Sequence, residues 1–243
     1  MGQLYDQFIS RTDLDIHKWH HYFPIYEKSF ERYRGKAPKM LEIGVQNGGS
    51  SRMFADWLGE GTHITGADID PACAKHSIPG KIDIYIGDQA NTDFLDMLID
   101  KHGPWDIILD DGGHTNNQII TSFQRLFPKL NEGGTYLIED THAHWMGEEF
   151  RDHPRGLSVV SMVADLFDNM HRWSGDKSKF GHWHVPPELR GPPTPAPYLT
   201  RYVEAVHLYD SVIVIEKRRR EEPFSEGRRA GVPRTSSYRL KGM

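Results

Sequence analysis

The sequence predicts an α/β protein built on a doubly wound, seven-stranded sheet, and three observations support this fold class. Short apolar runs alternate with segments of helical periodicity between residues 39 and 140. A glycine-rich turn follows the first apolar run, and acidic residues follow several of the later ones. Alternating strands and helices are typical of a mostly parallel sheet whose crossover connections are right-handed.

The expected strands are short, apolar and bounded by turn residues. They cover residues 39–43, 63–67, 82–86, 105–109 and 134–138, and a C-terminal β-hairpin covers residues 202–208 and 211–216. The helices expected between them are marked by apolar side chains at helical spacing, namely Met53, Phe54, Trp57 and Leu58, then Phe94, Leu95 and Leu98, then Ile119, Ile120, Phe123, Leu126 and Phe127. A further helix is expected over residues 157–173.

The chain is expected to form one domain over residues 1–216, with a helical arm over residues 1–36. In that arm, Trp19, Tyr22, Tyr26 and Phe30 recur at a helical spacing, and Pro24 is expected to break or kink the helix. Residues 147–201 include a long stretch rich in Gly, Pro and His, which predicts a lid over the substrate. Residues 217–243 have little apolar content and are expected to be a flexible basic tail.

Composition and charge narrow the class of function. The chain has 243 residues, enough for one α/β domain with a full core. Its net charge is −5, and residues 1–216 carry −11 of charge against +6 in residues 217–243. An acidic body argues against nucleic acid as a partner. No signal peptide or membrane-spanning run is visible, and the single cysteine, Cys73, excludes an internal disulfide, so a cytoplasmic location is expected.

A glycine-rich turn joins the first strand to the next helix, in LEIGVQNGGSS, residues 41–51. Gly44 and Gly48 would let a ligand approach the backbone, and the helix start at Ser50 offers free N–H groups. Glu42 ends the strand beside this turn. The spacing departs from the dinucleotide pattern G-x-G-x-x-G, and no Gly-Lys-Ser/Thr follows. The glycines serve either the shape of a tight turn or the binding of a nucleoside.

Acids after the second and third strands favour the nucleoside interpretation. Asp68 lies in the run GADID, residues 66–70, where a carboxylate can accept hydrogen bonds from ribose hydroxyls. Asp88 ends the run IGD, where we expect it to meet an adenine amino group.

Two acidic pairs end the fourth and fifth strands, Asp110–Asp111 and Glu139–Asp140. Neighbouring strands lie about 5 Å apart, so these carboxylates are expected to converge. Uncompensated carboxylates in one cleft repel each other, and a hard divalent cation removes that conflict. We therefore predict Asp111, Glu139 and Asp140 as metal ligands, with Asp110 on the cofactor side. Loop solvation or helix capping is the alternative for these acids.

His114 lies three residues after Asp111 and is expected at the start of a helix. A helix N-terminus and a nearby cation both favour neutral imidazole, the form that a general base needs. His114 and Asp111 are therefore the predicted catalytic pair, and a purely local hydrogen bond is the alternative for the histidine.

Four other histidines alternate in HAHW and HWH, and they are expected at the rim of the site. No cysteine or further cluster completes a zinc site with them. They are His142, His144, His182 and His184.

The runs LEIGVQNGGSS, GADID, LDDGGH and GGTYLIEDTH together resemble the class I S-adenosylmethionine-dependent methyltransferases. More narrowly, the chain resembles the metal-dependent sugar O-methyltransferases of macrolide biosynthesis and the cephalosporin-pathway methyltransferase group. The resemblance covers about residues 16–146 and implies a Rossmann-like fold. It implies Mg²⁺ or Mn²⁺ on Asp111, Glu139 and Asp140, His114 as base, and S-adenosylmethionine near Glu42, Gly44, Gly48 and Asp68. Gly113 departs from the family, whose members often have serine there.

The resemblance implies methyl transfer to a hydroxyl of a small sugar or glycoside, from a natural product or a polysaccharide, by a homo-oligomer. An acceptor hydroxyl of β-lactam or catechol type is an alternative. A non-catalytic module that binds S-adenosylmethionine is a second alternative, which the intact His114 and acids argue against. The glycine spacing disfavours an NAD(P)-dependent enzyme.

Overall fold

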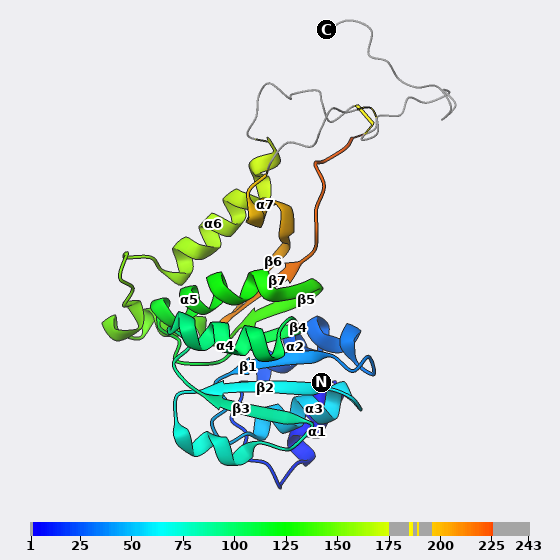
Figure 1. Ribbon diagram of the computed structural model, residues 1–243, viewed down its shortest axis with the longest axis vertical. Coiled ribbons are helices and arrows are strands. Elements are labelled where there is room, and N and C mark those ends of the chain that lie inside the picture. The colour runs from blue at the N-terminus through cyan, green and yellow to red at the C-terminus, as the bar shows by residue number, and fades with distance from the viewer. Residues whose placement is uncertain (1, 175–184, 187–188, 190–195, 226–243) are drawn as a thin grey trace, which may run out of the picture.

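A computed structural model describes residues 2–174, 185–186, 189 and 196–225, which form a seven-stranded sheet in the order β3-β2-β1-β4-β5-β7-β6 (Figure 1). The first five strands run parallel, and β7 runs antiparallel to both β5 and β6. The seven predicted strands are confirmed. Their bounds are β1 Lys39–Ile43, β2 His63–Asp68, β3 Ile82–Ile86, β4 Trp105–Asp110, β5 Leu130–Ile138, β6 Val203–Tyr209 and β7 Val212–Lys217.

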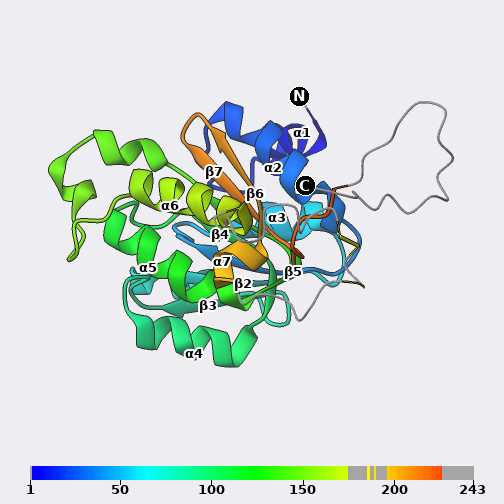
Figure 2. The same ribbon diagram turned by 90° about the horizontal axis from the view of Figure 1, so that it is seen from above.

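Helices cover both faces of the sheet and bury two separate apolar clusters (Figures 1 and 2). On one face, α4 (Thr92–His102), α5 (Asn116–Leu126) and α6 (Val159–His171) contribute Leu95, Phe123 and Leu166. On the other face, α1 (Gln3–Ser10), α2 (Phe23–Phe30) and α3 (Gly49–Leu58) contribute Leu4, Phe23 and Phe54. The short α7 (Tyr198–Tyr202) leads into β6. Because strands covered on both faces are largely apolar, the central strands were recognisable as nearly continuous apolar runs.

The N-terminal arm differs from the prediction in two ways. Only Phe23–Phe30 of the expected helix is α-helical, and residues 11–19 are not helical. Pro24 lies in the first turn of α2, where its missing N–H costs nothing, so it begins the helix instead of breaking it. Trp19 is 50% exposed because it precedes the helix, whereas Tyr22, Tyr26 and Phe30 are buried.

The lid over residues 147–201 stays a prediction, and one part of this segment packs on the core. Its central helix, α6, buries Val159, Met162 and Leu166 against the sheet and α5, so this part belongs to the core layer. The other residues that this lid would need, 175–184, 187–188 and 190–195, lie outside the described residues, as do His182 and His184.

The start of the predicted basic tail continues the fold. Arg218 N donates to Tyr202 O at 3.0 Å, and Arg220 N donates to Arg201 O at 2.6 Å. Residues 226–243 lie outside the described part of the chain. Among the described helices, none combines the length and the apolar character needed to cross a membrane.

The sheet order places the polar strand ends together. β1 lies between β2 and β4. The chain therefore winds outward from β1 in two directions, through β2 and β3 on one side and through β4 and β5 on the other. Such a switch point opens a crevice at the carboxyl ends of the strands. The turns that follow β1, β2, β4 and β5 all lie along this edge.

Candidate active site

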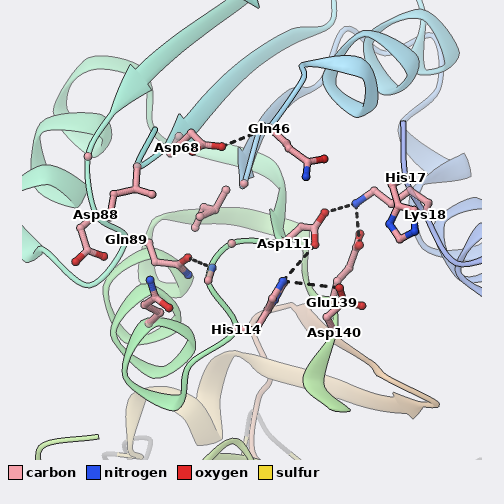
Figure 3. A pocket seen from close by; sticks show the side chains of 18 of the residues that line it. His17, Lys18, Gln46, Asp68, Asp88, Gln89, Asp111, His114, Glu139 and Asp140 are labelled. Atoms are coloured by element: carbon pink, nitrogen blue, oxygen red, sulfur yellow. Dashed lines mark hydrogen bonds and ion pairs between the residues drawn. The ribbon is translucent and has the colours of Figure 1, made fainter. Parts of the chain in front are cut away.

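A cavity of about 320 Å³ lies at the carboxyl edge of the sheet (Figure 3). This volume suits a small-molecule site. Its walls come from the turns after the first five strands and from the N-terminal segment that crosses this edge. The polar and charged lining residues are His17, Lys18, Tyr22, Gln46, Asp68, Asp88, Gln89, Asp111, His114, Gln118, Glu139 and Asp140.

The glycine-rich turn packs directly on the acidic turn after β4. Gly44 has φ 89°, a left-handed conformation that favours glycine. A Cβ atom added there would lie 1.8 Å from the carbonyl oxygen of Asp111. The Asp111 N–H in turn donates to Ile43 O at 2.9 Å. Gly44 therefore allows the close approach of two loops that both line the cavity.

Asp68 and Asp88 line the cavity, as their predicted binding roles require. The Asp68 carboxylate accepts backbone N–H bonds from Val45 at 2.9 Å and Gln46 at 2.8 Å. Partial burial by itself would raise the pKa of Asp68, but these backbone donors and that of Asp70 outweigh it and lower the pKa. Asp68 is therefore a fixed carboxylate at the end of β2, where it faces the cavity (Figure 3).

Asp110 is buried and does not line the cavity, so its place on the cofactor side stays a prediction. Its carboxylate is buried and accepts hydrogen bonds from Ser122 Oγ at 2.6 Å and Gln89 Nε2 at 2.9 Å. Side chains alternate along a strand, so Asp110 points toward α5 while Asp111, in the turn, reaches the cavity. Any effect of Asp110 on a ligand passes through Gln89, whose Oε1 accepts from Gly113 N at 2.9 Å.

Glu42, Gly48 and Ser50 also lie outside the cavity lining, so their contact with a cofactor stays a prediction. The fully buried Glu42 accepts a hydrogen bond from Ser51 Oγ on α3. Burial raises the pKa of Glu42, and the positive charge of Lys18 partly opposes this. Gly48 lies against the side chain of His76, so the turn itself separates these positions from the cavity.

Three of the predicted site residues converge on one point. His114 Nε2 lies 4.0 Å from Asp111 Oδ1 and 3.7 Å from Asp140 Oδ2 (Figure 3). One donor atom from each residue lies within 4.8 Å of the other two. The two carboxylates are chemically suitable ligands for a hard divalent cation, and the imidazole nitrogen lies beside them.

An unusual backbone conformation orients two of these three side chains. His114 has φ 58° and Asp140 has φ 51°, both in the left-handed region that non-glycine residues seldom adopt. His114 lies before the helix, because α5 has Thr115 as its N-cap. Held backbone strain of this kind is common at functional sites.

Glu139 is close to this point, but its oxygens are engaged elsewhere. Its Oε2 accepts from Lys18 Nζ at 2.8 Å, and its Oε1 accepts from the Tyr26 hydroxyl at 2.6 Å. Burial and then the charge of Asp111 raise the pKa of Glu139, while Lys18 opposes them. The structure therefore groups Asp111 and Asp140 with His114, where the sequence predicted a set of three acids.

Sequence reasoning missed Lys18 and the hydroxyls of Tyr22 and Tyr26. Lys18 Nζ also donates to Asp111, and its side chain is only 4% exposed. Burial lowers the pKa of Lys18, but the charges of Asp111 and Glu139 outweigh it and raise the pKa, so the group stays cationic. The Tyr22 hydroxyl donates to Asp140 Oδ1. The sequence held one sign of the tyrosines, because Tyr22 and Tyr26 place hydroxyl groups among the apolar residues at helical spacing. It held no comparable sign of Lys18.

The chain matches known proteins in sequence. Residues 41–141 match a family described as a methyltransferase domain. The 8-demethyl-8-(2-methoxy-alpha-L-rhamnosyl)-tetracenomycin-C 3'-O-methyltransferase of Streptomyces olivaceus is 31% identical over 215 residues, which are 84% of this chain and 51% of the relative. The mycinamicin VI 2''-O-methyltransferase of Micromonospora griseorubida is 33% identical over 213 residues, which are 84% of this chain and 49% of the relative.

A solved structure has the same fold. The MycE methyltransferase from the mycinamycin biosynthetic pathway, in complex with Mg, SAH and mycinamycin VI, superposes with a TM-score of 0.70. Its sequence is 28% identical, and the match covers 95% of this chain and 56% of that chain. The fold and these matches together show that the chain belongs to the class I S-adenosylmethionine-dependent methyltransferases.

Within that class, the chain is similar to the sugar O-methyltransferases of macrolide and tetracenomycin pathways, as its motifs predicted. The chain spans about half the length of the curated relatives it matches.

Proposed function

We propose that this chain transfers a methyl group from S-adenosylmethionine to a hydroxyl of a sugar or glycoside, with Mg²⁺ or Mn²⁺ as cofactor. The observation that carries the proposal is the convergence of His114 Nε2 with carboxylate oxygens of Asp111 and Asp140 in one cavity. The similar MycE structure was solved with Mg and SAH, which supports the same pair of cofactors here.

The cofactor half of the cavity is the side lined by Gly44, Asp68 and Asp88. The Asp68 carboxylate is held by backbone N–H groups, and its position at the end of β2 suits hydrogen bonds from the two ribose hydroxyls. Asp88 accepts from Ala90 N at 2.8 Å and lines the same wall, where it would meet the adenine.

Asp111 and Asp140 would hold the cation, because each has a carboxylate oxygen directed at the shared point. Glu139 would join them as a third ligand once Lys18 gives up its Oε2. A divalent cation bound there lowers the pKa of an acceptor hydroxyl and stabilises its developing negative charge. The two acids come from adjacent strand ends, so the sheet itself fixes the distance between them.

His114 would accept the proton of the acceptor hydroxyl at Nε2, the ring nitrogen that faces both carboxylates. The carboxylate of Asp140 lies 3.7 Å from this nitrogen. The acceptor oxygen forms a bond to the methyl carbon as the bond from that carbon to sulfur breaks, which leaves a neutral thioether. This displacement requires the acceptor oxygen in line and about 3 Å from the methyl.

The decisive experiment measures methyl transfer by mass spectrometry with and without EDTA. The acceptors are a glycoside with free vicinal hydroxyls, its deoxy analogue and a catechol. We expect methylated glycoside only with Mg²⁺ or Mn²⁺ present, and loss of product in EDTA that added Mg²⁺ reverses. Full activity in EDTA would contradict cation dependence. Transfer to the catechol alone would contradict the sugar acceptor.

A homo-oligomeric state and a cytoplasmic location are also part of this proposal, and they rest on resemblance and composition. The small-molecule acceptor rests on the resemblance, and the acidic charge of residues 1–216 argues against a nucleic acid partner. Analytical ultracentrifugation of the full chain tests the oligomeric state, and a single sedimenting monomer would contradict it.

A further inference from the structure

The Lys18 ammonium lies inside the carboxylate cluster. Nζ donates to Asp111 Oδ2 and, at 2.8 Å, to Glu139 Oε2. Among the described residues that line the cavity, Lys18 is the only lysine or arginine. It therefore supplies the one permanent positive charge among these lining residues, in contact with two acids.

The contacts of Lys18 divide the cluster into two parts (Figure 3). On one side, Asp111 Oδ1 and Asp140 Oδ2 face His114, and these atoms are free of Lys18. On the other side, Lys18 and Tyr26 occupy both oxygens of Glu139, whose side chain is 1% exposed. Glu139 can contact a cation in the cavity only if the ammonium gives up its Oε2.

An ammonium and a metal ion compete for the same carboxylates. A cation bound to both Asp111 and Glu139 would take the place that Nζ now holds, since hard divalent ions bind carboxylate oxygens at 2.0–2.6 Å. Lysine suits an exchange of this kind, because its charge is compact and its stem is flexible. Without either cation, the buried Glu139 would be an uncompensated charge, which is costly.

We propose that Lys18 is an internal competitor of the divalent cation, which neutralises Asp111 and Glu139 in the metal-free protein and is displaced from them when the metal binds. This inference rests on the proposed cation-dependent function. It assigns Lys18 a positioning role: the ammonium keeps the carboxylates in place before the metal arrives and sets how tightly the metal is held.

Lys18→Met is the direct test, because methionine keeps most of the stem and removes the charge. We expect Lys18→Met to bind Mn²⁺ at least about tenfold more tightly than the wild type in isothermal titration, because the repulsion is gone. In the absence of metal, its Tm should fall by at least about 5 °C, since Glu139 loses its partner. Saturating Mn²⁺ should close most of that gap.

Lys28→Met is the matched control. Lys28 is an exposed lysine on α2 that contacts the Tyr209 hydroxyl and lies outside the cavity lining. Its Mn²⁺ affinity and its metal-dependent change in Tm should equal those of the wild type.

A second pair keeps the test usable if Lys18→Met does not fold. Glu139→Gln and the double variant Lys18→Met/Glu139→Gln carry no charge at position 139, so neither leaves it buried and unpaired. The double variant should bind Mn²⁺ several-fold more tightly than Glu139→Gln alone, because Lys18 still pairs with Asp111 in the latter. Equal or weaker Mn²⁺ binding on removal of Lys18, in either background, would overturn the competitor role while leaving the proposed function intact. No Mn²⁺ binding by the wild type or any variant would instead overturn the cation-dependent function.

Discussion

At the scale of single residues, His114 combines an unusual backbone with the predicted chemistry. Its φ of 58° brings Nε2 between Asp111 and Asp140. Asparagine tolerates the left-handed region better than most residues, so His114→Asn removes the imidazole with little backbone strain. We expect the variant to bind S-adenosylhomocysteine within about twofold of the wild type and to lose at least about 100-fold in turnover.

Calorimetry and a single-turnover methyl-transfer assay measure these two quantities. His207→Asn, on β6 and outside the cavity lining, is the control and should be unaffected in both. Turnover within tenfold of the wild type in His114→Asn would rule out the base role.

Some residues of the site lie in a short sequence motif, and others reach it from distant parts of the chain. Asp111 and His114 lie in one short run, so the spacing of the run was enough to pair them. Lys18 and Tyr26 reach Glu139 across 121 and 113 residues of sequence. No local pattern encodes such a contact, because it depends on the path of the N-terminal segment over the sheet edge. The sequence therefore predicted the carboxylates of the site and missed the positive charge of Lys18.

Gly44 offers a test of the loop contact beneath the site. Gly44→Ala would add a Cβ 1.8 Å from the backbone oxygen of Asp111, in addition to strain at φ 89°. We expect the free energy of unfolding to fall by clearly more than the cost of strain alone, which is about 1–2 kcal/mol. Binding of S-adenosylhomocysteine should be lost.

Gly80→Ala is the matched control for Gly44→Ala. Gly80 has φ 75°, but an added Cβ there meets nothing within 4 Å. Its loss of stability in urea unfolding should reflect strain only, and its ligand affinity should be unchanged. Equal stability losses in the two variants would show that the contact with Asp111 is unimportant.

At the scale of elements, the 3-10 turn Pro71–His76 after β2 carries the single thiol, Cys73, and places it close to Asp68. Cys73 is buried, and its Sγ donates to Gln46 O at 3.1 Å. Burial, and then the negative charge of Asp68, raise the pKa of Cys73 to about 11. The thiol should therefore stay protonated and unreactive at neutral pH.

Alkylation by iodoacetamide tests this prediction. We expect labelling of the folded protein at pH 8 to be at least about tenfold slower than labelling in denaturant. Because the folded pKa lies above the unfolded value, this thiol favours folding below about pH 9, and the contribution is lost as the pH rises through about 11. Equal rates at pH 8 in the folded and denatured protein would contradict the raised pKa.

The elements also show which patterns carry structural information. The central strands could be predicted because burial on both faces makes them largely apolar runs, and the edge strands β3 and β6 because apolar residues alternate along them. The arm could not, because the helical spacing of Tyr22, Tyr26 and Phe30 extends back to Trp19 although the helix itself begins at Phe23. Periodicity alone does not say where a helix starts, and here Pro24 marked the start.

At the scale of the whole molecule, the site depends on three distant parts of the chain at one sheet edge. The N-terminal segment supplies Lys18, the turn after β4 supplies Asp111 and His114, and the end of β5 supplies Glu139 and Asp140. The antiparallel strand β7 pairs with β5 at Ile138, directly before these acids. The C-terminal strands therefore support the site without contributing a side chain to the cavity lining.

The residues that follow β7 extend this support, which makes the C-terminal boundary of the domain testable. The Arg220 guanidinium donates to Met170 O at 3.2 Å and Val203 O at 3.1 Å, and so ties the end of α6 to β6. A chain ending at Lys217 loses these bonds and the backbone bonds of Arg218 and Arg220. A chain ending at Ser225 keeps them and is the control. We expect the shorter chain to unfold at a Tm lower by roughly 4–10 °C, from the loss of about 2–3 kcal/mol of charge-assisted and backbone hydrogen bonds. Thermal unfolding followed by circular dichroism measures the difference, and identical Tm values would place the domain boundary at Lys217, as the sequence alone had suggested.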